Sequence, residues 1–130
     1  MRLNQVTVAA RDLDASILFY RTLGLSLIVK SDQYARFECP DGGSTFSLHL
    51  DPDAKGVSET TVYFENEDLD AAVARLKERG LRFDSDPVDQ RWLWREAYLR
   101  DPAGNRICLY KAGAIRRFPP WRLKGADAST

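Results

Sequence analysis

The sequence has few of the residues from which disulfide frameworks and zinc sites are built. Its 130 residues include one histidine and two cysteines. Cys39 and Cys108 lie far apart and form no C-x-x-C motif, the spacing typical of zinc sites, and two cysteines are too few for a disulfide framework. Both thiols are therefore predicted to be free, and a chain of this length can bury one core without cross-links.

An excess of charge and a long apolar run are also missing. Nineteen basic residues balance nineteen acidic ones. A chain without net charge has no overall field to attract nucleic acid or an anionic membrane. No apolar run approaches the roughly 18 residues of a membrane-spanning helix, and no basic and apolar signal segment opens the chain. We therefore expect a cytoplasmic protein with neither nucleic acid nor membrane as a partner.

An internal repeat is the strongest feature that the sequence does contain. Residues 12–27, DLDASILFYRTLGLSL, align without a gap with residues 68–83, DLDAAVARLKERGLRF. Each copy is typical of a helix, because aspartates at its start can cap the N-terminus and Gly24 or Gly80 can end it. Apolar residues recur at helical spacing in both copies. These residues are Ile17, Tyr20, Leu23, Leu69, Val73 and Leu76.

The segments around the two predicted helices repeat as well. Alternating strands precede them at QVTVA (residues 5–9) and TVYFE (61–65), and a strand and a hairpin follow each helix. The fold class is therefore α+β, with two βαβββ modules at about residues 1–56 and 57–111. Residues 112–130 depart from the repeat, and we expect Phe118 and Trp121 to pack this C-terminal tail onto the body or a partner subunit.

Strand periodicity divides the side chains between two faces of the predicted sheets. The apolar positions should lie beneath the helices, and the opposite positions combine aromatic with polar residues, as the walls of ligand pockets do. On this second face we expect Gln5, Thr7, Tyr34, Arg36, Glu38, Ser47, His49, Thr61, Tyr63, Glu65, Trp94, Glu96, Tyr98, Cys108 and Tyr110.

The repeat, the opening NQVTVAARDLDASILFYRTLGL and the closing WREAYLRDPAGNRICLY resemble the glyoxalase/bleomycin-resistance/dioxygenase superfamily, also called vicinal oxygen chelate proteins. The resemblance covers residues 3–111 as a single domain. It implies a U-shaped eight-stranded sheet around a cleft, with helices on the outer face, usually in a homodimer. In many enzyme members, a divalent metal in the cleft chelates two neighbouring substrate oxygens.

The resemblance also implies where a metal would be bound. The positions of the superfamily's metal ligands fall on Gln5, Ser47, Thr61 and Cys108. Only Gln5 matches, and one amide, two hydroxyls and a thiol are a poor set for a hard divalent ion. A displaced site for iron or zinc is the alternative, with Gln5, His49 and Glu96 as ligands. His49 is otherwise an ordinary hydrogen-bonding residue of a strand.

Two classes of function remain open at this stage. The first is binding of a small organic molecule without the usual metal: Arg36 or Arg95 would neutralise an anionic group, and Gln5 and His49 would donate or accept hydrogen bonds. The aromatic wall would consist of Tyr63, Trp94 and Tyr110.

The second class is a metal-dependent lyase, isomerase or ring-cleaving dioxygenase. In this case Gln5, His49 and Glu96 would hold an ion that polarises a substrate oxygen. A purely structural domain would instead fill the cleft with its own side chains. The motif RWLW at residues 91–94 would line the mouth of a pocket or pack at a dimer interface.

Overall fold

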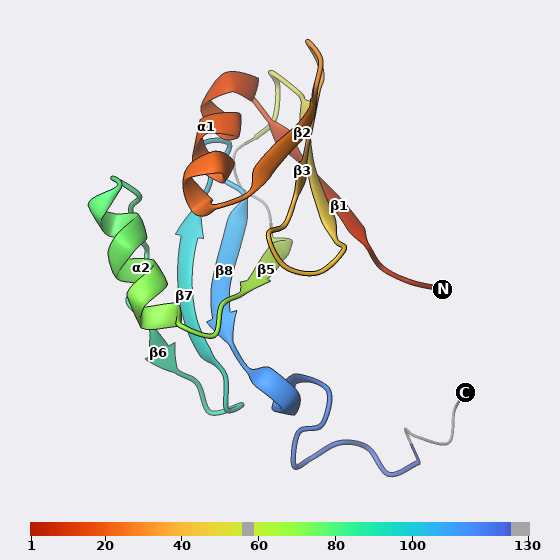
Figure 1. The fold of residues 1–130 in the computed structure, drawn as a ribbon, viewed down its shortest axis with the longest axis vertical. Coiled ribbons are helices and arrows are strands. Elements are labelled where there is room, and N and C mark those ends of the chain that lie inside the picture. Colours follow the sequence, from red (N-terminus) through yellow and green to blue (C-terminus); the bar gives the residue numbers. More distant parts are fainter. Residues whose placement is uncertain (56–58, 126–130) are drawn as a thin grey trace.

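The computed structural model describes residues 1–55 and 59–125. The first module contains β1 (Gln5–Ala10), α1 (Leu13–Leu23), β2 (Ser26–Lys30), β3 (Tyr34–Glu38) and β4 (Thr45–Leu50). The second contains β5 (Thr61–Glu65), α2 (Leu69–Glu78), β6 (Val88–Asp89), β7 (Arg95–Arg100) and β8 (Arg106–Lys111), and a 3-10 turn, η1 (Gly113–Arg116), follows. The predicted α+β fold of two βαβββ modules is confirmed (Figure 1).

The eight strands of the described residues divide into two sheets of four. The strand orders are β1-β4-β3-β2 and β5-β8-β7-β6, so the two modules have the same topology. In each sheet the first strand pairs in parallel with the last, and the other neighbours are antiparallel. Each helix lies beside the sheet of its own module (Figure 1). The internal repeat of the sequence is thus a structural repeat.

The helix ends match the predicted signals only in part. Asp12 caps α1 by accepting a hydrogen bond from the Ala15 amide at 3.0 Å, and Gly24, with a φ of 120°, ends this helix. At the start of α2, Asp68 makes no capping bond with its side chain. Its own amide instead donates to the Asn66 side chain at 2.8 Å. The predicted aspartate cap is therefore present in the first module and missing in the second.

One apolar core lies beneath the helices and joins the modules. Tyr20 is fully buried, and its ring lies 4.5 Å from that of Phe46 between centroids. Phe46 in turn contacts Phe64 of the second module edge-on at 5.6 Å. The residues predicted to face the helices are all part of this core or packed against it. They are Val6, Val8, Phe46, Leu48, Leu50, Val62, Phe64, Leu99, Ile107 and Leu109.

The chain after β8 does not bury the aromatic residues of the tail. Phe118 is 53 % exposed and Trp121 is 55 % exposed. The guanidinium of Arg122 lies 4.7 Å from the Phe118 ring centroid, and that of Arg117 lies 5.6 Å from it. Trp121 lines a shallow groove together with Trp92 of the β6–β7 turn.

In the part of the chain that is described, no helix has the length and apolar character needed to cross a bilayer.

Candidate functional site

The face of the first sheet that points away from α1 carries a hydrogen-bonded polar network. The strand register places Arg36 beside Ser47 and Tyr34 beside His49, as the predicted periodicity requires. Ser47 is fully buried and exchanges a hydrogen bond with Thr7 at 3.2 Å. This face is therefore polar without being freely solvated.

The phenol oxygen of Tyr34 is a focus of this network. It accepts a hydrogen bond from Nε of Arg36 at 2.9 Å, and the Arg36 guanidinium lies 5.3 Å from the Tyr34 ring centroid. Hydrogen bonding from Ser47 lowers the pKa of Tyr34 the most, and Arg36 and Gln5 lower it further. Among residues 1–55 and 59–125, no carboxylate lies within ion-pair distance of Arg36. Its positive charge is therefore available to an anionic group.

Two other predicted ligand-binding residues lie on this sheet. Oε1 of Gln5 accepts a hydrogen bond from the Thr45 hydroxyl at 2.7 Å, so its side-chain orientation is fixed. His49 lies on β4 between Ala9 and Tyr34, and its side chain is exposed. Arg95, the predicted alternative to Arg36, instead forms ion pairs with Asp70 and Asp89.

The second sheet carries an aromatic cluster made of three predicted wall residues. The rings of Trp94 and Tyr110 are stacked, with centroids 4.7 Å apart and an interplanar angle of 21°. Tyr63 meets both rings edge-on, at 6.0 Å from Trp94 and 5.6 Å from Tyr110. Tyr63 is 47 % exposed, whereas Tyr110 is buried. The cluster therefore presents an aromatic surface that is anchored in the sheet.

Glu96 lies on the same face of the second sheet and is only 2 % exposed. Its Oε2 accepts a hydrogen bond from the Trp92 indole nitrogen at 3.1 Å, and its Oε1 accepts one from the Tyr98 hydroxyl at 2.9 Å. Burial, together with Glu96, raises the pKa of the nearby Cys108 thiol to about 12. Cys108 therefore stays protonated and is not a nucleophile at neutral pH.

A crevice between the modules brings some of these residues together. It has a volume of about 510 Å³ and lies between the C-terminal end of α1, the β3–β4 turn and the end of β5. A smaller space of about 220 Å³ adjoins it and is lined by Gln5. The wall of the larger crevice consists of Leu23, Gly24, Leu25, Cys39, Pro40, Asp41, Gly42, Ser44, Tyr63, Phe64, Glu65, Asn66 and Tyr110.

The crevice joins only part of the predicted site. Gln5, Tyr63, Glu65 and Tyr110 line the two adjoining spaces. The predicted residues Arg36, His49, Trp94 and Glu96 do not. Sequence reasoning missed the contribution of Cys39 and the turn after it. The Pro-Asp-Gly-Gly motif at residues 40–43 signals a turn, but its position beside β5 depends on how the two modules pack.

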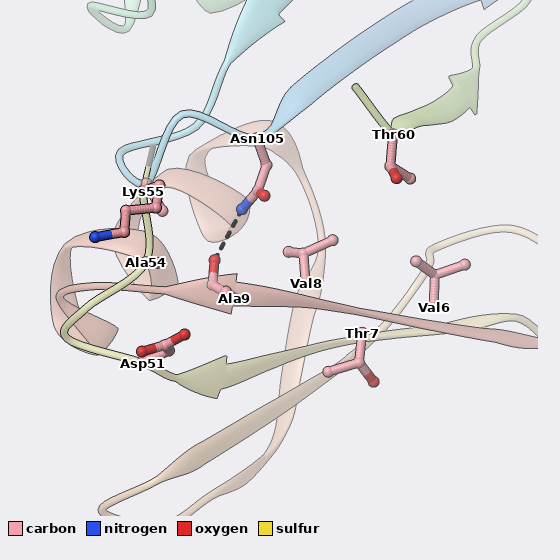
Figure 2. Close-up of a pocket in the computed structure, with 10 residues that line it drawn as sticks. Val6, Thr7, Val8, Ala9, Asp51, Ala54, Lys55, Thr60 and Asn105 are labelled. Carbon is pink, nitrogen blue, oxygen red and sulfur yellow. Dashed lines mark hydrogen bonds between the residues drawn. The ribbon is translucent and has the colours of Figure 1, made fainter. Parts of the chain in front are cut away.

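A second hollow, of about 370 Å³, runs along the outer edge of β1 (Figure 2). Val6 and Val8 lie on one side of the strand and Thr7 on the other, as in the predicted alternation. Nδ2 of Asn105 donates a hydrogen bond to the Ala9 carbonyl at 2.8 Å and closes one end of the hollow. This contact ties β1 of the first module to the turn before β8 of the second.

Comparison with known proteins places both βαβββ modules in one known superfamily. The model of the Glyoxalase/Bleomycin resistance protein/Dioxygenase superfamily matches residues 2–109. The chain belongs to this superfamily. An uncharacterized protein of Mycolicibacterium smegmatis is 33 % identical over 106 residues, which cover 81 % of this chain and 89 % of the relative.

Two solved structures of the superfamily illustrate its range. A bleomycin-binding protein complexed with bleomycin superposes with a TM-score of 0.72 at 20 % identity, covering 85 % of this chain and 98 % of that protein. Lactoylglutathione lyase from Agrobacterium tumefaciens gives 0.70 at 21 % identity, covering 85 % and 92 %. At such identities these likenesses show a common fold alone.

The side chains at the superfamily's metal positions do not suit a divalent metal. Gln5 and Ser47 are engaged in hydrogen bonds with Thr45 and Thr7, respectively. Cys108 is fully buried and offers a soft sulfur atom, whereas hard divalent ions prefer oxygen ligands. Thr61 adds only a neutral hydroxyl. This donor set therefore does not fit the ion that superfamily enzymes use.

The displaced set of Gln5, His49 and Glu96 is divided between the sheets. Gln5 and His49 lie on β1 and β4, whereas Glu96 lies on β7 with both oxygens hydrogen-bonded. Within residues 1–55 and 59–125, no group of three or more His, Cys, Asp and Glu is arranged to hold a metal ion.

Proposed function

We propose that this superfamily member binds a small organic molecule and does so without the metal of the superfamily's enzymes. The observation that carries the proposal is the crevice of about 510 Å³ that Tyr63 and Tyr110 line. Ligand pockets have volumes of about 300 to 1,000 Å³ and combine aromatic walls with a few placed polar groups. The adjoining space supplies one such group, the amide of Gln5.

The aromatic cluster would supply most of the contact area for the ligand. Trp94 and Tyr110 are held in place by their mutual stacking, so a planar molecule packing on this cluster would order few side chains. Tyr63 links the cluster to the crevice, because it contacts both rings and lines both adjoining spaces. A planar or aromatic ligand body is therefore favoured.

The polar face of the first sheet would recognise an anionic group on the ligand. Arg36 is held by Tyr34 and has no carboxylate partner among the described residues. An arginine in this state binds a carboxylate through charge-assisted hydrogen bonds. Because Arg36 and His49 lie outside the crevice, we infer a homodimer in which a second copy covers this face and completes the binding surface.

Binding of small aromatic acids to the purified chain tests the proposal. Benzoate and salicylate should quench tryptophan fluorescence and raise the melting temperature, and Tyr63→Ala should weaken binding at least tenfold. Leu18→Ala is the control, because Leu18 is 68 % exposed on α1 and away from the crevice. Equal affinities in the two variants would contradict the proposal, as would turnover of a methylglyoxal adduct or a catechol by metal-loaded protein.

A further inference from the structure

The carboxylate of Glu96 lacks a positive partner although it is almost completely buried. Both hydrogen-bond donors on its oxygens, Trp92 and Tyr98, are neutral. In residues 1–55 and 59–125, no lysine, arginine or histidine nitrogen lies within 4.0 Å of it. Burying a carboxylate without a counter-charge is unfavourable, because neutral donors replace only part of its hydration. A positively charged ligand at Glu96 would compensate this buried negative charge.

The surroundings of Glu96 are those that attract organic cations. Tyr110 lies opposite Glu96 in the register of β7 and β8, and Trp94 stacks on Tyr110. The face of an aromatic ring attracts a cation through its quadrupole. The guanidinium of Arg106 already lies 5.4 Å from the Tyr98 ring centroid, so one ring beside Glu96 holds a cation in this way.

We infer that Glu96 and these rings form a site for a protonated organic amine with an aromatic or apolar body. The inference rests on the proposed small-molecule function. It names the class of ligand that would bind at the second sheet of the protein. The ammonium group would donate to Oε2 of Glu96 in place of the Trp92 indole. The body of the ligand would pack on the aromatic cluster of Trp94, Tyr110 and Tyr63.

The position of Trp92 allows this exchange. Trp92 is 38 % exposed and lies in the turn between Gln90 and Trp94, which is closed by backbone hydrogen bonds of 2.7 Å and 2.9 Å. The next residue, Leu93, has a φ of 71°, which is unfavourable for leucine. Trp92 also lines a groove of about 310 Å³ together with Arg91 and Trp121, which gives the indole room to turn away from Glu96. Tyr98 keeps its own bond to Glu96, since burial raises its pKa and keeps it protonated.

Titration of the full chain with benzylammonium and its neutral analogue benzyl alcohol tests the inference. By calorimetry at pH 7, benzylammonium should bind at least tenfold more tightly than benzyl alcohol. Glu96→Gln should abolish that preference, because a glutamine carries no charge. Its oxygen can still accept from the Trp92 indole, while its amide nitrogen can donate to the Tyr98 hydroxyl oxygen. Glu78→Gln, an exposed change at the end of α2, should alter the affinity less than twofold. Trp92→Phe should tighten benzylammonium binding, because it removes the competing indole donor.

Three results would overturn the inference. They are equal binding of the two compounds, a preference for benzylammonium that survives Glu96→Gln, and weaker benzylammonium binding in Trp92→Phe. Binding of benzoate distinguishes failure of this inference from failure of the proposed function. Benzoate binding that depends on Tyr63, without any benzylammonium preference, would overturn the cation site alone. If Glu96→Gln does not fold, Trp92→Phe decides the question, because it leaves the carboxylate in place.

Discussion

The hydroxyl of Tyr20 donates a buried hydrogen bond of 2.6 Å to Oδ2 of Asp101, which lies 81 residues further along the chain. Asp101 also accepts hydrogen bonds from the amides of Ala103 and Asn105 through Oδ1. Nδ2 of Asn105 donates to Asp101 and to the Ala9 carbonyl. The turn at residues 101–105 therefore fastens α1 and β1 of the first module to β7 and β8 of the second.

Removal of the Tyr20 hydroxyl should destabilise the whole fold. Tyr20→Phe leaves a buried carboxylate oxygen short of one donor, which costs about 1–3 kcal/mol. Urea denaturation followed by circular dichroism measures the change in the free energy of unfolding. Tyr63→Phe is the matched control, because Tyr63 is 47 % exposed, and its change should stay within about 0.5 kcal/mol. Equal stability of Tyr20→Phe and wild type would show that the bond contributes nothing.

The same residue should make stability depend on pH in the alkaline range. Burial, and then the Asp101 charge, raise the pKa of Tyr20 above its usual value of 10.0. The unfolded chain therefore loses this proton near pH 10, while the folded chain keeps it. The stabilisation is complete below pH 10 and declines as the pH rises further.

Urea unfolding between pH 8 and 11 measures this decline. We expect a shallower decline in Tyr20→Phe than in the wild type. Some decline should remain, because burial also raises the pKa of Tyr98. Parallel pH profiles for the two proteins would rule out a contribution from Tyr20.

The two thiols should differ in their reaction with iodoacetamide. Burial raises the pKa of both, to about 12 for Cys108, so both should react more slowly at pH 8 than in the unfolded chain. Cys39 should react first, because it is partly exposed and lines the crevice, whereas Cys108 is fully buried. Peptide mass spectrometry resolves the two sites. Faster labelling of Cys108 would mean that the second sheet opens more readily than its packing indicates.

Protein purified without chelators should contain far less than one equivalent of iron, zinc, nickel or manganese. The reason is the donor set at Gln5, Ser47, Thr61 and Cys108, which offers no carboxylate or imidazole. Elemental analysis checks this, with His49→Ala as the comparison. Near-stoichiometric metal that disappears in His49→Ala would instead support the displaced site and an enzymatic function.

Periodicity explains which parts of the fold could be predicted. Val6 and Val8 alternate with Thr7, and the second module repeats this pattern. To predict from it which side chains face the core, it was enough that one face of each strand is buried. The helix caps were less certain, because capping depends on local geometry. Asp12 accepts the expected bond, whereas the side chain of Asp68 makes no capping bond at the start of α2.

The arrangement of the candidate site was less accessible to such reasoning. Tyr63, Trp94 and Tyr110 were expected on one face, and their rings contact one another in the structure. The crevice beside Cys39 was not expected, because it depends on how the β3–β4 turn packs near β5. The Trp92 bond to Glu96 was missed because it arises from the conformation of an irregular turn.

The sequence by itself determined the two modules, the face that each strand buries and the mixed polar and aromatic character of the opposite face. These properties follow from the spacing of residues along single helices and strands, because the burial of one face requires apolar residues at regular positions. Only the tertiary structure decided that Tyr20 meets Asp101 and that Glu96 is buried without a counter-charge. Such contacts depend on the packing of separate segments, and the spacing of residues along the chain does not encode their distances.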